Sequence, residues 1–376
     1  MIYLDNNATT KIDSKVFLKH CEVLRKNYGN ASSLYPIGVE SKNLIEDSRI
    51  RVAKFINADL NSGDRVIFTS CATESNNAVF HSVLGQNFKG QHIIISEVEH
   101  PSVYNIALYY EEAGCEVTRI KVNTNGVLNV SQLMDSLRNE TSIVSLMMVN
   151  SETGVLNDIE DISKMIRQSF PKVLIHTDAV QAAGKTPIDI NLLNVDFLTL
   201  SGHKFHAPKG IGALFIKRGV SFNPFIIGGH QEMGLRAGTE NVANIVALGE
   251  AAEIAQKGLE DGINTEIEAL RDYMEQELKR LFPDSIIFGE QSNRIGNTTN
   301  IGFKSVDGTK LVLRLAQKGI SVSSGTACNS ISASPSRVLS AMHAPSEYIR
   351  SIRISLSKEN CMSDIQALLS SLNELI

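Results

Sequence analysis

The sequence has few of the features that mark secreted, metal-bound or membrane-spanning proteins. It contains only five cysteines in 376 residues, and no two of them stand in Cys-x-x-Cys spacing. This argues against a disulfide scaffold and a zinc site, so we expect no metal and predict a cytoplasmic location. No apolar stretch approaches about eighteen residues, and the first residues have no basic start and no long apolar run. We therefore expect no membrane span and no signal peptide.

The chain also lacks a strong excess of one charge. Its net charge is −5, and no block of five like charges occurs. This argues against a protein that bulk charge holds on nucleic acid, and we expect no direct binding of that kind. Hydrophobic residues make up 43% of the chain and charged residues 20%, which is typical of a globular fold. The length allows two domains with a large core.

Short apolar segments alternate with helix-length amphipathic segments as far as about residue 255. The predicted strands are Val66–Thr69, His92–Ser96, Glu116–Ile120, Ile143–Val149, Val173–Thr177, Phe197–Leu200 and Gly212–Ile216. Helical patterns such as Glu74–Phe88 and Ser102–Ala113 separate most of them. The alternation predicts an α/β fold with a mostly parallel sheet of seven strands between helices. Such sheets bind ligands at the carboxyl ends of their strands.

The pattern changes after about residue 255, where a long charged helix is predicted at Asn264–Leu281. Shorter strands and helices follow at Ser285–Phe288, Thr298–Phe303, Gly308–Lys318, Arg350–Leu356 and Met362–Leu375. These shorter elements predict a smaller α+β domain. We therefore expect a large domain over residues 15–255 and a small domain formed by residues 1–14 and 256–376.

Two polar residues at the ends of predicted strands indicate a cofactor. Lys204 comes shortly after the strand Phe197–Leu200, and Asp178 follows the strand before it. An isolated lysine at such a place is most often a surface residue. A lysine at one strand end and a carboxylate at another are, however, what a pyridoxal-phosphate enzyme uses. The lysine holds the cofactor as a Schiff base, and the carboxylate pairs with the pyridinium nitrogen.

A phosphate site is predicted where a helix opens at Ala72 and Thr73, directly after the strand Val66–Thr69. The free N–H groups and the dipole of a helix N-terminus suit a phosphate group. Most such turns only cap a helix, so this pattern alone is weak. Ser201 and His203, beside Lys204, offer further donors to the same phosphate.

Four more polar residues are candidates, each with a simpler alternative. His100 suits stacking on a flat cofactor ring or moving a proton, although an isolated histidine there most often caps the next helix. Asn150 suits a cofactor hydroxyl or a substrate carboxylate, but asparagine is also a turn residue. Gln181 follows the predicted ring partner by three residues. Arg353 suits a bidentate clamp on a substrate carboxylate, whereas an isolated arginine is most often at the surface.

Cys328 lies in the uncharged, serine-rich segment Ser321–Ser336, whose composition is typical of a loop. Free cysteines are usually buried and inert, which we expect of Cys21, Cys71 and Cys115. A thiol on a loop can instead meet a substrate and then a partner. No Lys, Arg or His lies within eight residues of this thiol, so its reactivity depends on the folded site.

Taken together, these motifs resemble the cysteine desulfurases of the NifS/IscS type, within the class V aminotransferase group of pyridoxal-phosphate enzymes. The resemblance runs from end to end and is carried by residues 3–10, 72–77, 99–101, 176–181, 201–204, 208–212, 228–240 and 323–328, together with the turn at Asn150. It implies the pyridoxal-phosphate fold type I and assigns a role to each candidate.

The implied cofactor roles divide between the ring and the phosphate. Lys204 carries the cofactor, Asp178 pairs with its ring nitrogen, and His100 stacks on its ring. Gln181 contacts the ring hydroxyl. The phosphate ligands implied are Ala72, Thr73, Ser201 and His203, together with Thr239 from the second subunit of a homodimer.

The remaining implied roles concern the substrate, L-cysteine. Asn150, which also contacts the cofactor, and Arg353 hold its carboxylate. Cys328 accepts its sulfur, leaving L-alanine, and passes a persulfide to an acceptor protein. The routes open to that acceptor are iron–sulfur cluster assembly, tRNA thiolation and DNA phosphorothioation.

Two rival functions differ in class. A selenocysteine lyase or another class V aminotransferase has the same fold, although an aminotransferase needs no nucleophilic thiol such as Cys328. A non-catalytic scaffold of a sulfur-transfer complex is the second rival. The presence of Lys204, Asp178 and Cys328 together argues against it.

Overall fold

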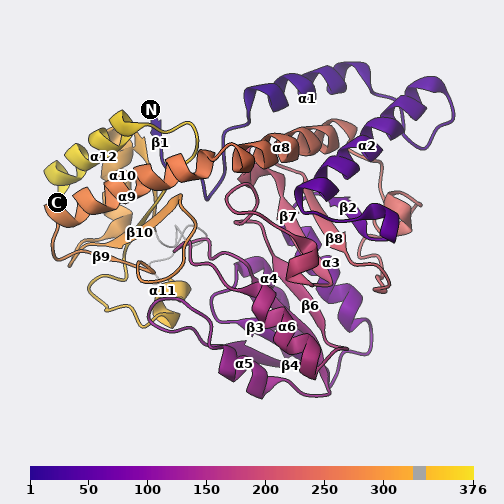
Figure 1. The fold of residues 1–376 in the computed structure, drawn as a ribbon, viewed down its shortest axis with the longest axis horizontal. Coiled ribbons are helices and arrows are strands. Elements are labelled where there is room, and N and C mark those ends of the chain that lie inside the picture. The colour runs from indigo at the N-terminus through magenta and orange to yellow at the C-terminus, as the bar shows by residue number, and fades with distance from the viewer. Residues whose placement is uncertain (325–335) are drawn as a thin grey trace.

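The computed structural model describes residues 1–324 and 336–376. A seven-stranded sheet forms one part of the molecule, and a four-stranded sheet lies at the end that holds both chain termini (Figure 1). A short parallel pair, β1 (Ile2–Tyr3) with β11 (Ile320–Ser321), ties the start of the chain to the smaller part. The prediction of an α/β fold with a smaller α+β part is confirmed.

The large sheet has the strand order β2-β8-β7-β6-β5-β3-β4. Its strands are β2 (Arg65–Thr69), β3 (His92–Ser96), β4 (Glu116–Ile120), β5 (Thr141–Met147), β6 (Leu174–Asp178), β7 (Phe197–Ser201) and β8 (Gly212–Ile216). All neighbours pair in parallel except β8, which is antiparallel to both β2 and β7. The interior strands are largely buried on both faces, and β3 is fully buried along its length, because helices cover both sides of a parallel sheet.

All seven strands were predicted from the sequence, three of them with the observed bounds. The prediction for β5 was wrong at its ends, since the strand ends at Met147 and not at Val149. The backbone of Val149 instead forms an isolated antiparallel bridge with Leu156. The chain therefore reverses after Asn150, and the apolar residue that enters this reversal has the same sequence pattern as a residue of the strand.

Helices flank the large sheet, and their bounds are α1 (Ser14–Lys26), α2 (Pro36–Phe55), α3 (Ala72–Leu84), α4 (Pro101–Glu112), α5 (Val130–Ser136), α6 (Ile159–Ser169), α7 (Ile190–Leu193) and α8 (Val242–Glu260). Helix α3 begins two residues before the predicted start and stops at Gly85. Gly85 has φ of 58°, a conformation that glycine adopts without steric cost. Helix α4 begins with Pro101 at its first position, where the missing N–H costs nothing.

The smaller sheet has the order β12-β13-β10-β9 and is antiparallel throughout. Its strands are β9 (Ile286–Ile287), β10 (Thr298–Gly302), β12 (Ser323–Ser324) and β13 (Ile352–Ser355). The helices of this part are α9 (Ile263–Leu281), α10 (Gly308–Gln317), α11 (Arg337–Ala341) and α12 (Met362–Leu375). A core of its own includes Leu4 from the N-terminal segment. The domain boundary at residue 255 stays a prediction, and α8 continues across that residue.

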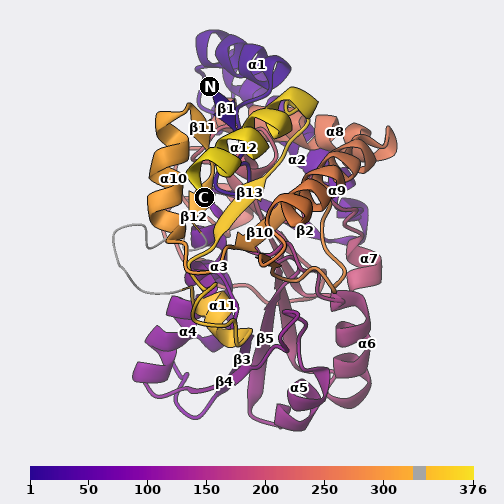
Figure 2. The same cartoon turned by 90° about the vertical axis from the view of Figure 1, so that its left-hand side faces the viewer.

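Figure 2 shows α9 and α12 on the side of the smaller sheet and α4, α5 and α6 around the larger one. In the part of the chain that the structure describes, no helix combines the length and apolar character needed to cross a membrane. The same residues contain no group of three acidic, histidine or cysteine side chains placed to hold a metal ion.

Candidate active site

A cavity of about 620 Å³ opens where β5, β6 and β7 end, between the two sheets. Because parallel strands end at one edge, polar residues that are distant in sequence meet there. Nine of the twelve predicted site residues line this cavity: Ala72, Thr73, His100, Asp178, Gln181, Ser201, His203, Lys204 and Arg353. The site is therefore largely where the sequence pattern placed it, although the role of each residue stays a prediction.

Lys204 lies in a short 3-10 turn that continues from β7. Its Nζ donates to the backbone oxygens of Asn7, at 2.7 Å, and Ala8, at 2.8 Å. The N-terminal segment thus passes directly over the lysine and directs its amine at the edge of the cavity. The segment that follows β1 therefore has a structural role, because its backbone carbonyl groups orient the Lys204 amine.

Asp178 and His100 are linked through two residues that sequence reasoning did not single out. Asn76 Nδ2 donates to Asp178 Oδ2 at 3.0 Å and to Ser102 Oγ at 2.9 Å. Ser102 Oγ lies 2.8 Å from His100 Nδ1. The other carboxylate oxygen, Asp178 Oδ1, accepts the N–H of Val180 at 3.0 Å. The aspartate is thereby fixed at the end of β6, in the position that suits a ring nitrogen.

The hydrogen bonds around Ser102 also fix the tautomer of His100. The backbone N–H of Ser102 donates to His100 Nδ1 at 3.2 Å, and an N–H can only donate. The neutral ring therefore carries its proton on Nε2. Burial lowers the pKa of His100, and the charges of Lys204 and Arg337 lower it further, against the opposing effect of Asp178. His100 is thus an uncharged imidazole near neutral pH.

The predicted phosphate site fits an anion. Helix α3 opens at Ala72, and its N-cap residue, Cys71, makes no side-chain capping bond in the described structure. Ser201 Oγ is buried and lacks a hydrogen-bond partner among the described residues, although buried hydroxyl groups nearly always have one. An uncapped helix N-terminus beside an unsatisfied hydroxyl suits a phosphate oxygen. The residues present therefore fit pyridoxal phosphate.

His203 borders the same region. Its Nδ1 lies 3.1 Å from Thr9 Oγ1. Burial lowers its pKa to about 4, and the neighbouring charges of Lys204, Lys209 and Lys185 act in the same direction. The ring is therefore neutral at physiological pH, and it contributes a hydrogen bond to an anion in preference to a charge.

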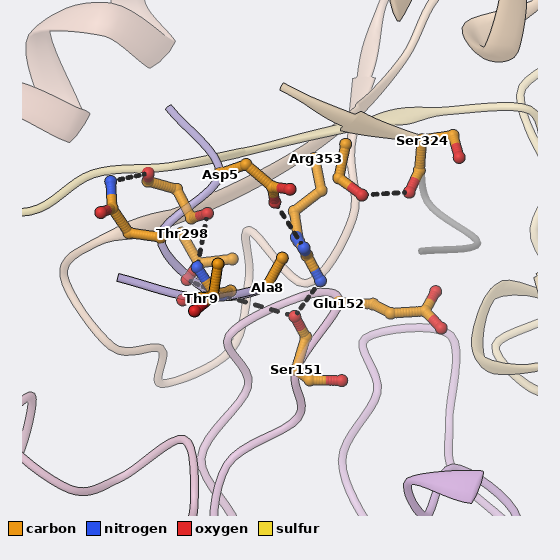
Figure 3. A network of polar contacts seen from close by, with 12 residues as sticks. Asp5, Ala8, Thr9, Ser151, Glu152, Thr298, Ser324 and Arg353 are labelled. Carbon is orange, nitrogen blue, oxygen red and sulfur yellow. Dashed lines mark hydrogen bonds and ion pairs between the residues drawn. The ribbon is translucent and has the colours of Figure 1, made fainter. Parts of the chain in front are cut away.

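Arg353 projects from β13 of the smaller sheet, and only 3% of its side chain is exposed. Its Nη2 forms an ion pair with Asp5 Oδ1 at 2.7 Å, and its Nη1 donates to Ser151 O at 3.0 Å. Figure 3 shows the guanidinium group between these two partners. Its Nε is buried and has no partner within the described residues. The group is therefore held rigidly, with a donor left for a carboxylate.

Three predicted residues are not among the described residues that line the cavity. The amide oxygen of Asn150 accepts from Glu152 N, Thr153 N and Thr153 Oγ1 in the turn after β5, and Asn150 is not part of the cavity lining given by the described residues. Thr239 is exposed and likewise outside that lining. Cys328 lies outside the described residues. Their proposed roles stay predictions.

Two acids in the cavity wall, the buried Glu99 and the partly buried Glu152, were missed by sequence reasoning. Glu99 accepts from Ser96 Oγ at 2.6 Å and Met147 N at 3.0 Å, both on Oε1, while its Oε2 is buried without a partner in the described part of the chain. Burial raises its pKa to about 8. Burial also raises the pKa of Glu152 to about 7. Their position in the sequence could have indicated them, because Glu99 and Glu152 both come after strands, as Asp178 does.

The parallel sheet, the lysine and aspartate at its edge and the adjoining anion site define the class: a pyridoxal-phosphate-dependent enzyme of fold type I. The Aminotransferase class-V family profile matches residues 2–368. This chain belongs to that family and, within it, to the cysteine desulfurases, so the predicted fold, cofactor and family are confirmed.

Three similar proteins support this assignment. "Cysteine desulfurase 2" of Trichormus variabilis is 44% identical over 98% of this chain and 91% of that relative. A solved "NifS-like protein" superimposes with a TM-score of 0.92 at 33% identity, covering 100% of this chain and 98% of that one. A structure described as "SspA in complex with cysteine" gives a TM-score of 0.82 at 29% identity, covering 95% and 99%.

Proposed function

We propose that this enzyme converts L-cysteine to L-alanine and passes the sulfur, as a persulfide on Cys328, to an acceptor protein. The observation that carries the proposal is the cavity in which Lys204 and Asp178 meet Arg353. This combination suits a cofactor-bound amino acid, because the amine, the ring nitrogen partner and a carboxylate clamp all face one space. The cysteine-bound neighbour described above supports the choice of substrate.

Each side chain has a task that follows from its position. The bound cofactor supplies an electron sink for charge that develops at the substrate α-carbon. Lys204 holds the cofactor and moves a proton to or from that carbon. Arg353, fixed by Asp5, binds and orients the substrate carboxylate. His100 presents a protonated Nε2, which suits a hydrogen bond or proton transfer to a reacting group.

The sulfur step is proposed to use Cys328. Its thiolate attacks the substrate sulfur, so that an S–S bond forms as the carbon–sulfur bond breaks. The electron pair left on carbon takes up a proton, and alanine and enzyme persulfide result. No external oxidant or reductant is required, since cysteine plus thiol balances alanine plus persulfide.

The described residues on either side of the cysteine segment support this assignment. Ser323, at its start, pairs with Arg353 across β12 and β13. Ser336, at its end, donates to Glu152 Oε2 at 2.5 Å and lines the cavity. Cys328 stands four residues beyond Ser324 in the sequence, so it belongs to a segment whose described neighbours on both sides contact residues of the cavity wall.

We further propose a cytoplasmic homodimer and an acceptor in one of three routes: iron–sulfur cluster assembly, tRNA thiolation or DNA phosphorothioation. Two features support the dimer. Thr239 is exposed outside the cavity of its own chain. Among the described residues, eight of the twenty large hydrophobic side chains that are exposed fall between residues 17 and 50, and apolar surface gathered in one region marks interfaces. Co-purification from cells, with and without Cys328, identifies the acceptor.

Product analysis tests the proposed reaction. The purified protein, loaded with pyridoxal phosphate, is incubated with L-cysteine and a thiol, and amino-acid products are quantified. Alanine and released sulfide in equal amounts are expected. A keto acid in place of alanine would indicate an aminotransferase, and no turnover with intact cofactor binding would indicate a scaffold.

A further inference from the structure

A second lysine lies beside the active site, although no catalytic step described above uses it. Lys185 is partly buried and borders a small cavity of about 80 Å³, which Lys204 borders too. Its Nζ donates to Gln181 Oε1 at 2.6 Å. Burial lowers the pKa of this amine, and the positive charges of Lys204 and Arg353 lower it further. The position of the Lys185 amine beside the charges of Lys204 and Arg353 therefore needs a physical explanation.

Lys185 is joined to Lys204 through one side chain and one carbonyl group. Gln181 Nε2 donates to the backbone oxygen of Asn7 at 2.9 Å. The same oxygen accepts Lys204 Nζ at 2.7 Å. Three short hydrogen bonds thus run from Lys185 through Gln181 and Asn7 to the lysine that holds the cofactor.

The two hydrogen-bond partners of the Gln181 amide, Asn7 and Lys185, determine its orientation. The carbonyl of Asn7 can only accept, so the NH2 group of the amide faces it. The amide oxygen then faces Lys185, whose amine donates a hydrogen bond to it. One N–H of the amide serves Asn7, and the second is left for a ligand, because Gln181 lines the larger cavity. Without Lys185, the partly buried amide oxygen would lose its donor, and the side chain would be free to turn.

We propose that Lys185 is a positioning residue for the cofactor: it holds the Gln181 amide so that its N–H donates to the oxygen substituent of the cofactor ring. This inference rests on the proposed role of Gln181 as the contact of the ring hydroxyl. Lys185 itself acts only through Gln181. It follows that removing Lys185 has no further effect once Gln181 is gone.

A double-mutant cycle tests this dependence. The variants are Lys185→Met, Gln181→Met and the double variant, each with a side chain of similar length. The readouts are the dissociation constant of pyridoxal phosphate from each protein and the visible absorption maximum of the bound cofactor. Lys185→Met should weaken cofactor binding about tenfold, as the loss of one hydrogen bond implies. Its absorption maximum should shift in the same direction as that of Gln181→Met.

The double variant should match Gln181→Met in both readouts, within about twofold. Lys217 supplies a matched control, because its Nζ also donates to a side-chain amide, Asn194 Oδ1, at 2.6 Å, and burial also lowers its pKa. Lys217 does not border the cavity lined by the described residues. Lys217→Met should therefore leave cofactor affinity and absorption unchanged.

The proposal is overturned if Lys185→Met binds and absorbs like the wild type, or if its effect adds to that of Gln181→Met. Should Lys185→Met not fold, the comparison of Gln181→Met with the double variant remains, since that pair leaves no amide oxygen without a donor. Equal values there support the proposal, and unequal values reject it. Failure of the proposed reaction is distinguishable, because it appears as absent alanine production in the wild type.

Discussion

Three residues in the cavity wall have pKa values shifted in favour of their uncharged forms. Burial lowers the pKa of His100 and raises those of Glu99 and Glu152. These three pKa shifts have the same main cause, because burial removes water from each side chain and makes its charged form less favourable. The charges that remain, such as Arg353, are those with a partner. An uncharged lining lets the few placed charges act strongly, because the local dielectric is low.

Glu99 gives a prediction about pH and stability. Its pKa in the folded protein is about 8, above the ordinary value of 4.5. The stability that it contributes is therefore fully present below about pH 4.5 and is lost as the pH rises towards 8. Glu99→Gln keeps the shape without the ionisation. Relative to the wild type, this variant should gain stability with rising pH, by at most about 1.4 kcal/mol per pH unit.

Urea unfolding at a series of pH values between 5 and 8 measures this difference. Glu152 titrates in the same window but is present in both proteins, so its contribution cancels. A stability difference that is constant across the series would mean that Glu99 is already ionised in the folded protein.

At the scale of elements, the positions of loops depend on buried polar pairs. The loop that carries Thr239 is held on β2 by Glu232, whose Oε1 and Oε2 accept from Arg49 at 3.0 and 2.7 Å. Glu232 Oε2 also accepts Phe68 N at 2.8 Å. Glu232 and Met233 have φ of 46° and 59°, a left-handed conformation that costs roughly 1–2 kcal/mol per residue. The ion pair offsets that strain.

Glu232→Ala should therefore destabilise the protein by about 3–5 kcal/mol, because it removes the buried carboxylate partner of Arg49 and leaves only the exposed carboxylate of Glu46. The exposed pair of Glu277 with Arg280 is the control, since 65% of the arginine side chain is exposed. Glu277→Ala should have a much smaller effect on stability, because solvent screens an exposed ion pair. Denaturant unfolding measures both. Similar costs for the two variants would show that the buried pair does not anchor the loop.

The sequence allowed more of the elements to be predicted than of the contacts between them. Strands and the polar residues that follow them carry a local pattern, which is why Asp178 and Lys204 were found. Asn76, Ser102 and Lys185 have no such signal, because they matter through side chains that meet only after folding. The end of β5 was misplaced because Val149 is apolar and extended, although it pairs with Leu156 and not with a strand of the sheet. The contacts of Asn150 could not be predicted for the same reason, because its side-chain amide forms hydrogen bonds within the turn that follows β5.

At the scale of the whole molecule, the proposed dimer places Thr239 at the phosphate site of the partner subunit. Sedimentation of the active enzyme should therefore show two subunits at assay concentrations. Thr239→Val should weaken pyridoxal-phosphate binding about tenfold without changing the sedimentation coefficient, since one hydrogen bond is lost. A fully active monomer would refute the assembly, and unchanged cofactor affinity would refute the role of Thr239.

The central claim is that sulfur from cysteine passes to Cys328. The most direct test is mass spectrometry of the peptides after a single turnover with L-cysteine, with Cys328→Ser as the matched control. The account predicts one added sulfur atom, on the peptide that holds Cys328. The control should still bind the cofactor and cysteine, while its turnover falls by several orders of magnitude. The added sulfur on Cys21, Cys71, Cys115 or Cys361 instead, or full activity in Cys328→Ser, would contradict the account.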